Sequence, residues 1–402
     1  TSFVPEDGNW KRGKFQCECG YRGQLRDYFD HQDQIPSYQR YAVYYEDADN
    51  NRRYRGIEHK DHQAISQAQR DYRKNIDNLP IPRSKIQEGE TTRQLLTYNY
   101  TQYHELFTER QRLVLGRLFE LADRQSPQAL SEVLVTILAS TLHFNNAHAA
   151  WDTHRDNVRS IFQIHNHRIP VETVEANPLA EQWQGSLANA HARFADAKSY
   201  LNSPRERLRT PSGDLATVSL SDESLDPNRI KRLSVSSADR LDIETESIDC
   251  VVIDPPYYNN VQYGELLDFY YVWLRNVLND DYSEFASTHV PKLREVSVNR
   301  KRGKDETYYL QALRNSFEEV HRILSFGGDL VCLFHIAEEE AWRDLIRILV
   351  RTGFQIRGAI QLQELDHETE DSRHAYDIVV FAQKSPRDED ISFEMIRQNL
   401  LY

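Results

Sequence analysis

An apolar run that ends directly in an acid and two prolines is the feature of this 402-residue chain that most constrains its fold. Residues 250–263 read CVVIDPPYYNNVQY. The apolar residues up to Ile253 predict a short buried strand, which the prolines end because they cannot continue a strand ladder. In an open α/β sheet, ligands bind beyond the carboxyl ends of the strands. Asp254 therefore lies where a ligand site is expected.

The residues of this turn suit a planar group that carries an exocyclic amine. Pro255 and Pro256 keep the turn rigid and have no amide hydrogens, so we expect their carbonyl oxygens to remain unpaired acceptors. The Asp254 carboxylate and a fixed carbonyl can together accept both hydrogens of an amine. Tyr257 offers a flat face on which a base can stack. A base inside a duplex is out of reach, so such a site predicts that the base is flipped out.

The longer stretch "DPPYYNNVQYGELLDFYYVWLR" resembles the adenine-specific DNA methylases that carry the domain of unknown function 1156. The upstream segments "LFTERQRLVLGRL", "FNNAHAAWDTHRDNVRSIF" and "EANPLAEQWQGSL" are also similar to that family, so the resemblance covers roughly residues 90–384. It implies methyl transfer from S-adenosylmethionine to adenine N6, and Asp in place of Ser at the first motif position favours adenine over cytosine. The implied catalytic residues are Asp254, Pro255, Pro256 and Tyr257.

The resemblance also implies a cofactor residue and a group of substrate residues. Asp239 ends the predicted strand "RLSVSSAD", where such enzymes hold the adenosyl group; a solvated loop acid is the alternative. The residues after the turn are expected to line the same cleft, with a plain loop as the alternative. They are Tyr258, Asn259, Asn260 and Tyr263.

Basic side chains in the segment 292–304, "KLREVSVNRKRGK", predict a loop that contacts DNA phosphates. A solvated loop is the alternative, and "PRERLR" at 204–209 is a weaker candidate. The proposed phosphate-contacting residues are Arg300, Lys301, Arg302 and Lys304.

Four segments are predicted along the chain. They are a small mixed domain over 1–90, a helical region over 91–203, a polar linker over 204–229, and the C-terminal part of a methyltransferase catalytic domain over 230–402. In the last segment strands alternate with helices, which predicts an α/β, Rossmann-like, doubly wound sheet. Its final strands, "FQIRGAIQL" and "AYDIVVFAQK", are candidates for an antiparallel edge pair.

A glycine-rich cofactor loop of the type F-x-G-x-G, which the resemblance implies near the start of the fold, is missing. None of the 15 glycines forms a G-x-G. We therefore expect an incomplete sheet. Either a second polypeptide supplies the first strands and the loop, or the cofactor site is degenerate.

The four cysteines suggest at most half of a metal site. Cys17 and Cys19 in "CECG" resemble half of a zinc ribbon, but structural zinc needs four ligands, usually from C-x-x-C pairs. Zinc would require a partner's thiolates, with His31 as a further candidate ligand or simply a surface residue. Cys250 and Cys332 lie in apolar strands and are predicted core residues.

Composition excludes several protein classes. No apolar run of about 18 residues is present, the N-terminus lacks a signal-peptide pattern, and four cysteines do not make a disulfide framework. We therefore expect a cytoplasmic protein with no membrane partner. A net charge of −13 is unusual for a nucleic-acid-binding protein, so DNA binding would depend on local basic patches.

Two further groups of side chains have both a functional and a structural interpretation. The first is a polar cluster that could contact DNA or form an internal network: His143, His148, His154, Asn145, Asn146, Trp151 and Arg155. The second is aromatic and is better explained as core packing: Phe269, Tyr270, Tyr271 and Trp273.

Three functions remain open from the sequence. The first is a DNA adenine-N6 methyltransferase, as the DPPY-bearing subunit of a split enzyme in restriction-modification or phage defence. The second is an RNA methyltransferase acting on an exocyclic amine, which the lack of any RNA-binding module disfavours. The third is a non-catalytic DNA-binding scaffold subunit, which the intact DPPY disfavours.

Overall fold

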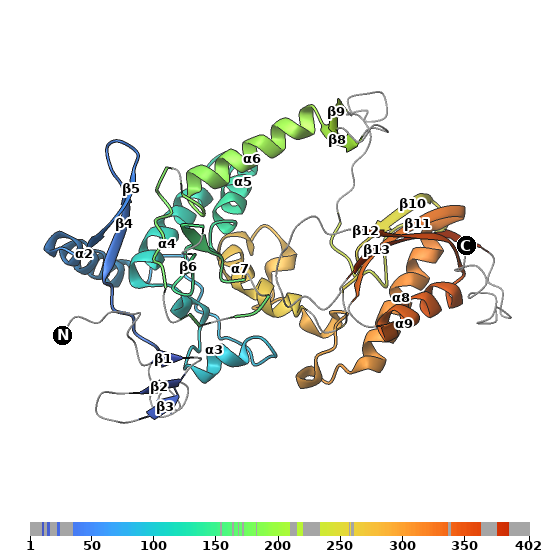
Figure 1. Cartoon of the computed structure of the whole chain (residues 1–402), viewed down its shortest axis with the longest axis horizontal. Helices are drawn as coiled ribbons and strands as arrows, with labels where there is room; N and C mark the ends of the chain where they lie inside the picture. The colour runs from blue at the N-terminus through green and yellow to red at the C-terminus, as the bar shows by residue number, and fades with distance from the viewer. Residues whose placement is uncertain are drawn as a thin grey trace. The chain divides into compact units, whose positions relative to one another are not determined.

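The computed structural model divides the chain into two compact units (Figure 1). The helical unit comprises 1–229 and 264–290, and the sheet unit comprises 230–263 and 291–402. The residues that the structure describes are 10–11, 14–16, 22–24, 35–152, 155–162, 165–167, 169–170, 173–181, 183–209, 215–219, 234–256, 258, 261–336, 339–362 and 376–385.

The sheet unit is α/β, as expected. Its four strands are β10 (Ile248–Ile253), β11 (Leu324–Ile336), β12 (Phe354–Leu362) and β13 (Tyr376–Lys384), in the spatial order β10-β11-β13-β12. β10 and β11 are parallel, and β13 is antiparallel to both of its neighbours. The expected antiparallel pairing of the last two strands is confirmed, but β13 lies inside the sheet and only β12 is at the edge. This mixed sheet with crossover helices confirms the Rossmann-like α/β class.

Two helices of the sheet unit pack on one face of its sheet (Figure 1). They are α8 (Glu306–Ile323) and α9 (Glu339–Arg351). The Asp305 side chain caps α8 by accepting a hydrogen bond from the Tyr308 amide. Phe317 of α8 and Leu349 of α9 join the same core as the sheet residue Leu330. Successive right-handed crossovers that advance in one direction place their helices on the same face.

The opposite face of this sheet is apolar and has no covering helix among the described residues, so the predicted doubly wound arrangement, with helices on both faces, is not found there. Strand register places Val252, Val331 and Phe381 in one row across the sheet, and Leu333, Val379 and Ile360 in the next. Val252 is 67% exposed and Ile360 is 55% exposed.

This open face corrects one prediction about the strand before the turn. β10 is not a fully buried strand, and Cys250 is exposed instead of lying in the core. Cys332 is buried, as predicted.

The helical unit contains most of the remaining elements. Its helices are α2 (His59–Asn75), α3 (Arg93–Thr97), η2 (Tyr103–Leu106), α4 (Glu109–Asp123), α5 (Gln128–Ala139), α6 (Leu187–Asn202), α7 (Tyr263–Leu278, in this unit from Gly264) and η3 (Ser283–Phe285). Its strands are β1 (Trp10–Lys11), β2 (Lys14–Gln16), β3 (Arg22–Gln24), β4 (Ala42–Glu46), β5 (Arg52–Gly56), β6 (Ala150–Asp152), β7 (Asn157–Arg159), β8 (Arg205–Arg209) and β9 (Leu215–Ser219). The predicted linker 204–229 therefore contains the β8–β9 hairpin. No described helix is long and apolar enough to cross a membrane.

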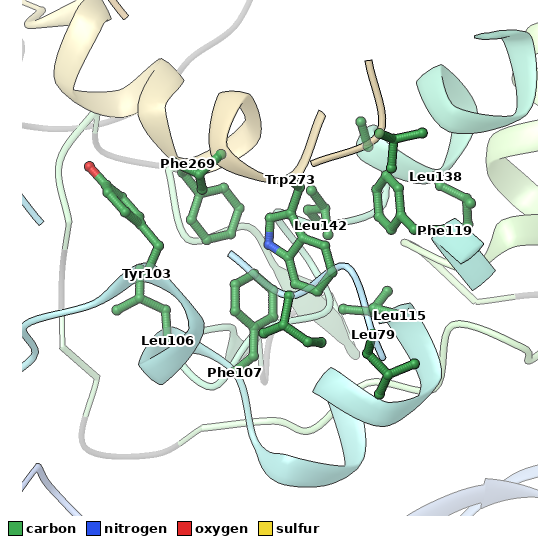
Figure 2. Packing of buried hydrophobic residues seen from close by; sticks show 14 of the residues in the cluster. Leu79, Tyr103, Leu106, Phe107, Leu115, Phe119, Leu138, Leu142, Phe269 and Trp273 are labelled. Atoms are coloured by element: carbon green, nitrogen blue, oxygen red, sulfur yellow. The ribbon is translucent and has the colours of Figure 1, made fainter. Parts of the chain in front are cut away.

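Helix α7 follows the DPPY segment in sequence but contributes its apolar side to the core of the helical unit. Figure 2 shows Phe269 and Trp273 pointing from α7 toward Phe107 and Phe119. The Trp273 ring lies 5.1 Å from that of Phe107 and 5.2 Å from that of Phe119, between ring centroids. The core-packing interpretation of Phe269 and Trp273 is confirmed, and Tyr270 packs against the same core.

Two buried carboxylates tie α7 to the rest of the helical unit. Glu265 accepts hydrogen bonds from the Thr91 amide and hydroxyl, both at 2.8 Å, and from the Glu90 amide at 3.1 Å. Asp268 accepts from the Val290 amide at 2.8 Å and from the Tyr103 hydroxyl at 3.2 Å. Buried charges are tolerated where hydrogen bonds compensate their lost hydration, so these contacts fix the start of α7.

Candidate base-amine site

The turn at the carboxyl end of β10 presents an exposed carboxylate beside a fixed backbone. Asp254 is exposed, and Pro255 after it is buried. The Tyr309 hydroxyl, on α8, donates a 2.9 Å hydrogen bond to the Pro256 carbonyl. The expectation that both proline carbonyls are unpaired is therefore wrong for Pro256. The Pro255 carbonyl accepts no hydrogen bond from the residues that the structure describes.

The next residues of the turn are only partly described. Tyr257, Asn259 and Asn260 lie outside the described residues, so their predicted roles stay predictions. Tyr258 has a φ of 44°, in the left-handed region, and its carbonyl accepts a 2.9 Å hydrogen bond from the Val298 amide. Its ring stands edge-on to Tyr309, with 5.4 Å between centroids, and packs against the core of the sheet unit. Tyr258 therefore holds the turn to its surroundings.

Tyr263 lies on the same side of the site as Asp254. Its side chain is 42% exposed. Burial raises the pKa of the Tyr263 hydroxyl, and the carboxylates of Asp254 and Glu295 raise it further. A neighbouring negative charge opposes ionisation of the phenol, so the two acids add to the larger effect of burial on this pKa. Asp254 is thus near enough to influence the Tyr263 hydroxyl, and the predicted place of Tyr263 in the cleft stays a prediction.

The basic segment 292–304 forms a compact loop with two 3-10 turns, η4 (Lys292–Arg294) and η5 (Arg300–Arg302). Backbone hydrogen bonds between Asn299 and Lys304, at 2.8 and 3.0 Å, close the part of the loop that contains η5. Arg300 and Lys301 are exposed at its tip.

Lys304 has a different place from the one predicted. It is only 3% exposed, and its ammonium group donates to the carbonyls of Lys292 and Glu295 at 3.0 and 2.9 Å. Its charge is directed into the loop, so Lys304 supports the loop instead of facing solvent. Arg302 is half-buried.

Gln262, which the sequence analysis did not single out, connects the turn to this loop. It is 4% exposed. Its side-chain amide donates to the Val298 carbonyl at 2.8 Å and accepts from the Asn299 side chain at 2.9 Å and the Ser297 hydroxyl at 3.4 Å. The only signal in the sequence is a glutamine between the turn and an amphipathic helix, and such a position does not reveal burial.

Asp239 lies in a turn and not at the end of a strand. An isolated bridge between Ser237 and Arg240 closes this turn, and the described residues 234–236 before it form no strand, which corrects that prediction. Burial raises the pKa of Tyr308, and the carboxylates of Asp239 and Glu295 raise it further. Glu295 also raises the pKa of Tyr263.

The residues present fit only part of S-adenosylmethionine. An exposed carboxylate such as Asp239 suits the hydroxyl groups of an adenosyl ribose, because ionised carboxylates are pure acceptors. The methionine end needs close backbone approach, for which glycines are used. The sequence has no G-x-G that could provide it.

The histidine- and asparagine-rich cluster belongs to the interior of the helical unit. Asn145, Asn146 and His148 are buried. The Asn145 side chain donates to the carbonyls of Thr141 and Gly185, at 2.8 and 2.7 Å, while the Asn146 side chain accepts from the His148 amide at 2.9 Å. These bonds favour the structural interpretation of the cluster.

Other members of this cluster lie at its periphery or outside the description. Trp151 packs edge-on to Tyr44, with 4.7 Å between ring centroids. The Arg155 amide donates to Asp152. His154 is not among the described residues.

The metal prediction falls outside the part of the chain that the structure describes. Cys17, Cys19 and His31 are not described. Among the described residues, no group of three or more His, Cys, Asp or Glu side chains could hold a metal ion.

Comparison with known proteins finds only distant structural likenesses. No family model and no curated protein matches the chain. One similar structure is a Thermus thermophilus protein named provisionally as a DNA modification methylase, with 18% identity, a TM-score of 0.22, and coverage of 43% of this chain and 62% of that one. The same protein complexed with S-adenosyl-L-methionine has 16% identity, a TM-score of 0.22, and coverage of 42% and 59%.

Another similar structure is an S-adenosylmethionine-dependent methyltransferase from Methanosarcina mazei, with 14% identity, a TM-score of 0.20, and coverage of 38% of this chain and 66% of that one. The chain therefore spans less than two thirds of the length of these proteins. TM-scores this low carry no argument about function, which has to come from the residues of the site.

Proposed function

We propose that this chain is the DPPY-bearing part of an S-adenosylmethionine-dependent DNA methyltransferase that modifies adenine N6. The observation that supports this most is the exposed Asp254 carboxylate at the end of β10, next to the Pro255 carbonyl, to which no described residue donates a hydrogen bond. The bond from Tyr309 to Pro256 holds the turn. In our proposal these two acceptors bind the two hydrogens of the target amine.

The chemistry of adenine explains why two acceptors are useful. The lone pair of N6 is delocalised into the ring, which makes the amine a poor nucleophile. Acceptors on both hydrogens favour the pyramidal form, in which the lone pair is available, and fixed orientation lowers the barrier further. The cofactor, when bound, supplies an electrophilic methyl group. Asp254 holds the amine and is placed to receive the proton that nitrogen loses after methylation.

The basic loop supplies the proposed contact with DNA. Residues 292–304 contain six Lys or Arg and one Glu, in a chain with a net charge of −13. Arg300 and Lys301 are exposed there, in the same unit as Asp254. Phosphate contacts of this kind position a duplex without reading its sequence.

The glycine-rich cofactor loop is proposed to come from a second polypeptide. β10 is an edge strand of the described sheet, and its Val252 belongs both to that open edge and to the uncovered apolar face. A strand added beside β10 would pair with the open edge of the sheet, and an apolar helix over the row of Val252 would cover the apolar face. Restriction-modification and phage defence are the settings in which we propose such a complex acts.

The test is transfer of labelled methyl groups by the chain with its partner. Duplex DNA and RNA are offered separately, and the modified base is identified after digestion. Label in N6-methyladenine of DNA is the expected result, and Asp254→Ala is expected to abolish it. Asp249→Ala, an exposed acid at the other end of the same strand, is the matched control and should retain activity.

Two other outcomes of this experiment would indicate the alternative functions. Label in RNA alone would indicate the RNA exocyclic-amine enzyme. DNA binding without any label, under conditions in which the complex binds cofactor, would indicate a non-catalytic scaffold.

A further inference from the structure

We propose that Gln262 is a positioning residue that couples the phosphate-contacting loop 292–304 to the base-amine turn at Asp254. Phosphate binding at Arg300 and Lys301 would then help to place the base. This inference rests on the proposed function and deepens it, because it names the residue through which the two parts of the site act together.

The first observation is that Gln262 holds three residues of the loop. Its side chain bonds to Ser297, Val298 and Asn299, three consecutive residues, at 3.4, 2.8 and 2.9 Å. Both ends of the amide are used, one as donor and one as acceptor. Since the side chain is buried, breaking these bonds would leave polar groups without water to replace the lost partners. Gln262 therefore holds this segment of the loop in one arrangement.

The second step is the rigidity of the loop itself. The Lys304 ammonium group ties together Lys292, Glu295 and Ser297, the last at 3.4 Å. The Asn299 side chain bonds to Gln262 through its amide nitrogen and accepts from the Arg302 amide through its oxygen, at 3.2 Å. One asparagine thus links Gln262 to η5, the turn that carries Arg300 and Lys301.

The third step is the connection to the base-amine turn. The Val298 amide donates to the Tyr258 carbonyl at 2.9 Å, while the Val298 carbonyl accepts from Gln262. Residues 297–299 are therefore bonded to the turn on both sides of its undescribed residues 259–260. A displacement of the basic loop would be transmitted to Tyr258, two residues after Pro256.

The coupling has a physical use in catalysis. Binding energy from parts of a substrate far from the reacting atoms raises the rate only where it is converted into orientation at the reacting centre. Backbone phosphates are such remote parts. A rigid link between the phosphate contacts and the acceptors for N6 makes this conversion possible.

The test uses Gln262→Met, which keeps the length of the side chain and removes its hydrogen bonds. With the complete complex, three quantities are measured: DNA affinity as a function of salt, the fluorescence of 2-aminopurine at the target base, and the single-turnover rate of methyl transfer. We expect DNA affinity to change less than about threefold and its salt slope to stay the same, because Arg300 and Lys301 remain. The signal of the flipped base should fall, and the single-turnover rate should fall by about 10- to 100-fold.

Two comparison variants separate positioning from simple binding. The double variant Arg300→Ala/Lys301→Ala should reduce the salt slope, which is the slope of log affinity against log salt concentration, by about 2. Each phosphate contact contributes roughly 0.9 to this slope. Gln311→Met removes an exposed glutamine of α8 that bonds to Asn315 on the same helix, at 2.7 Å, and should change none of the three quantities.

Two results with Gln262→Met would overturn the inference. Unchanged flipping and rate in Gln262→Met would remove the proposed coupling. A reduced salt slope like that of the double variant would mean that Gln262 serves binding alone. If Gln262→Met does not fold, as judged by thermal melting, Asn299→Ala breaks the same link from the loop side and is held to the same criteria. If the wild-type complex transfers no methyl group, the proposed function fails, but affinity and 2-aminopurine fluorescence still decide the coupling.

Discussion

The Tyr309 hydroxyl lies 2.9 Å from the Pro256 carbonyl, which it donates to across 53 residues of sequence. This bond fixes the Pro256 carbonyl, whereas the Pro255 carbonyl accepts no hydrogen bond from the described residues. Tyr309 is itself buried on α8. The helix that packs beneath the sheet thereby sets the backbone of the base-amine turn.

Tyr309→Phe is expected to lower the free energy of unfolding by about 1 kcal/mol, the usual loss for one hydrogen bond. It should also reduce single-turnover methyl transfer, because the freed turn no longer holds its acceptors in one orientation. Chemical denaturation and rapid-quench kinetics measure these effects. Tyr200→Phe, which removes an exposed hydroxyl bonded to Glu206, is the control. A fully active Tyr309→Phe variant would show that the turn keeps its shape without this bond.

Gly89→Ala is expected to destabilise the protein severely. A Cβ at Gly89 would lie 2.1 Å from Oε1 of Glu265, whose carboxylate is held by three hydrogen bonds and cannot retreat. Overpacking typically costs about 1–3 kcal/mol, and we expect the upper end or more because a buried charge is disturbed. Thermal melting measures it. Gly56→Ala, where a Cβ meets nothing within 4 Å, should melt within a few degrees of the wild type.

Stability is expected to fall as the pH drops from about 6.5 towards 4. Burial lowers the pKa of His148 from 6.5 to about 3 and the pKa values of His143 and His167 to about 4. In this window the unfolded chain binds protons that the folded chain does not, so each pH unit costs up to about 1.4 kcal/mol per histidine.

Denaturation midpoints at pH 7.5, 6 and 5 check this pH dependence. His148→Phe should reduce the slope of stability against pH, because it removes the titrating imidazole. The substitution breaks no hydrogen bond of that ring, since neither ring nitrogen of His148 has a partner in the described residues. The exposed His62→Gln serves as control. A slope that His148→Phe leaves unchanged would contradict the assignment to this residue.

The ring of Tyr257 is predicted from the sequence to stack on the flipped base. Tyr257→Ala should then weaken binding of DNA with an extrahelical target base by about 1–3 kcal/mol, while Tyr257→Phe should have little effect. Fluorescence anisotropy with such a duplex measures both variants. Equal losses from the two substitutions would assign the role to the hydroxyl.

The chain alone is expected to bind S-adenosylmethionine weakly. Asp239 can serve the adenosyl end, but the sequence holds no G-x-G loop for the methionine end. Calorimetric titration of cofactor, with and without the partner, measures this. Tight binding by the chain alone would mean that another segment replaces the glycine loop, and the split-enzyme proposal would be wrong.

The sequence by itself determined the elements around the site. The apolar run before Asp254 and the two apolar stretches near the C-terminus are local patterns, and each predicted its strand correctly. Local periodicity is enough for this, because which side chains share one face of an element depends only on its own geometry. The position of Asp254 at a strand end followed from the same reasoning.

Only the tertiary structure decided which of these elements meet. The insertion of β13 between β11 and β12, the burial of α7 aromatics in the helical unit, and the exposure of Cys250 all depend on contacts between distant segments. The basic loop shows the limit most clearly. Lys301 and Lys304 are alike in sequence, but Lys301 is exposed and the Lys304 ammonium group is bonded to two carbonyls inside the loop. The folded shape of the loop decides which lysine is buried. Gln262 acquires its three partners in the same way, because a residue's burial is a property of the folded chain around it.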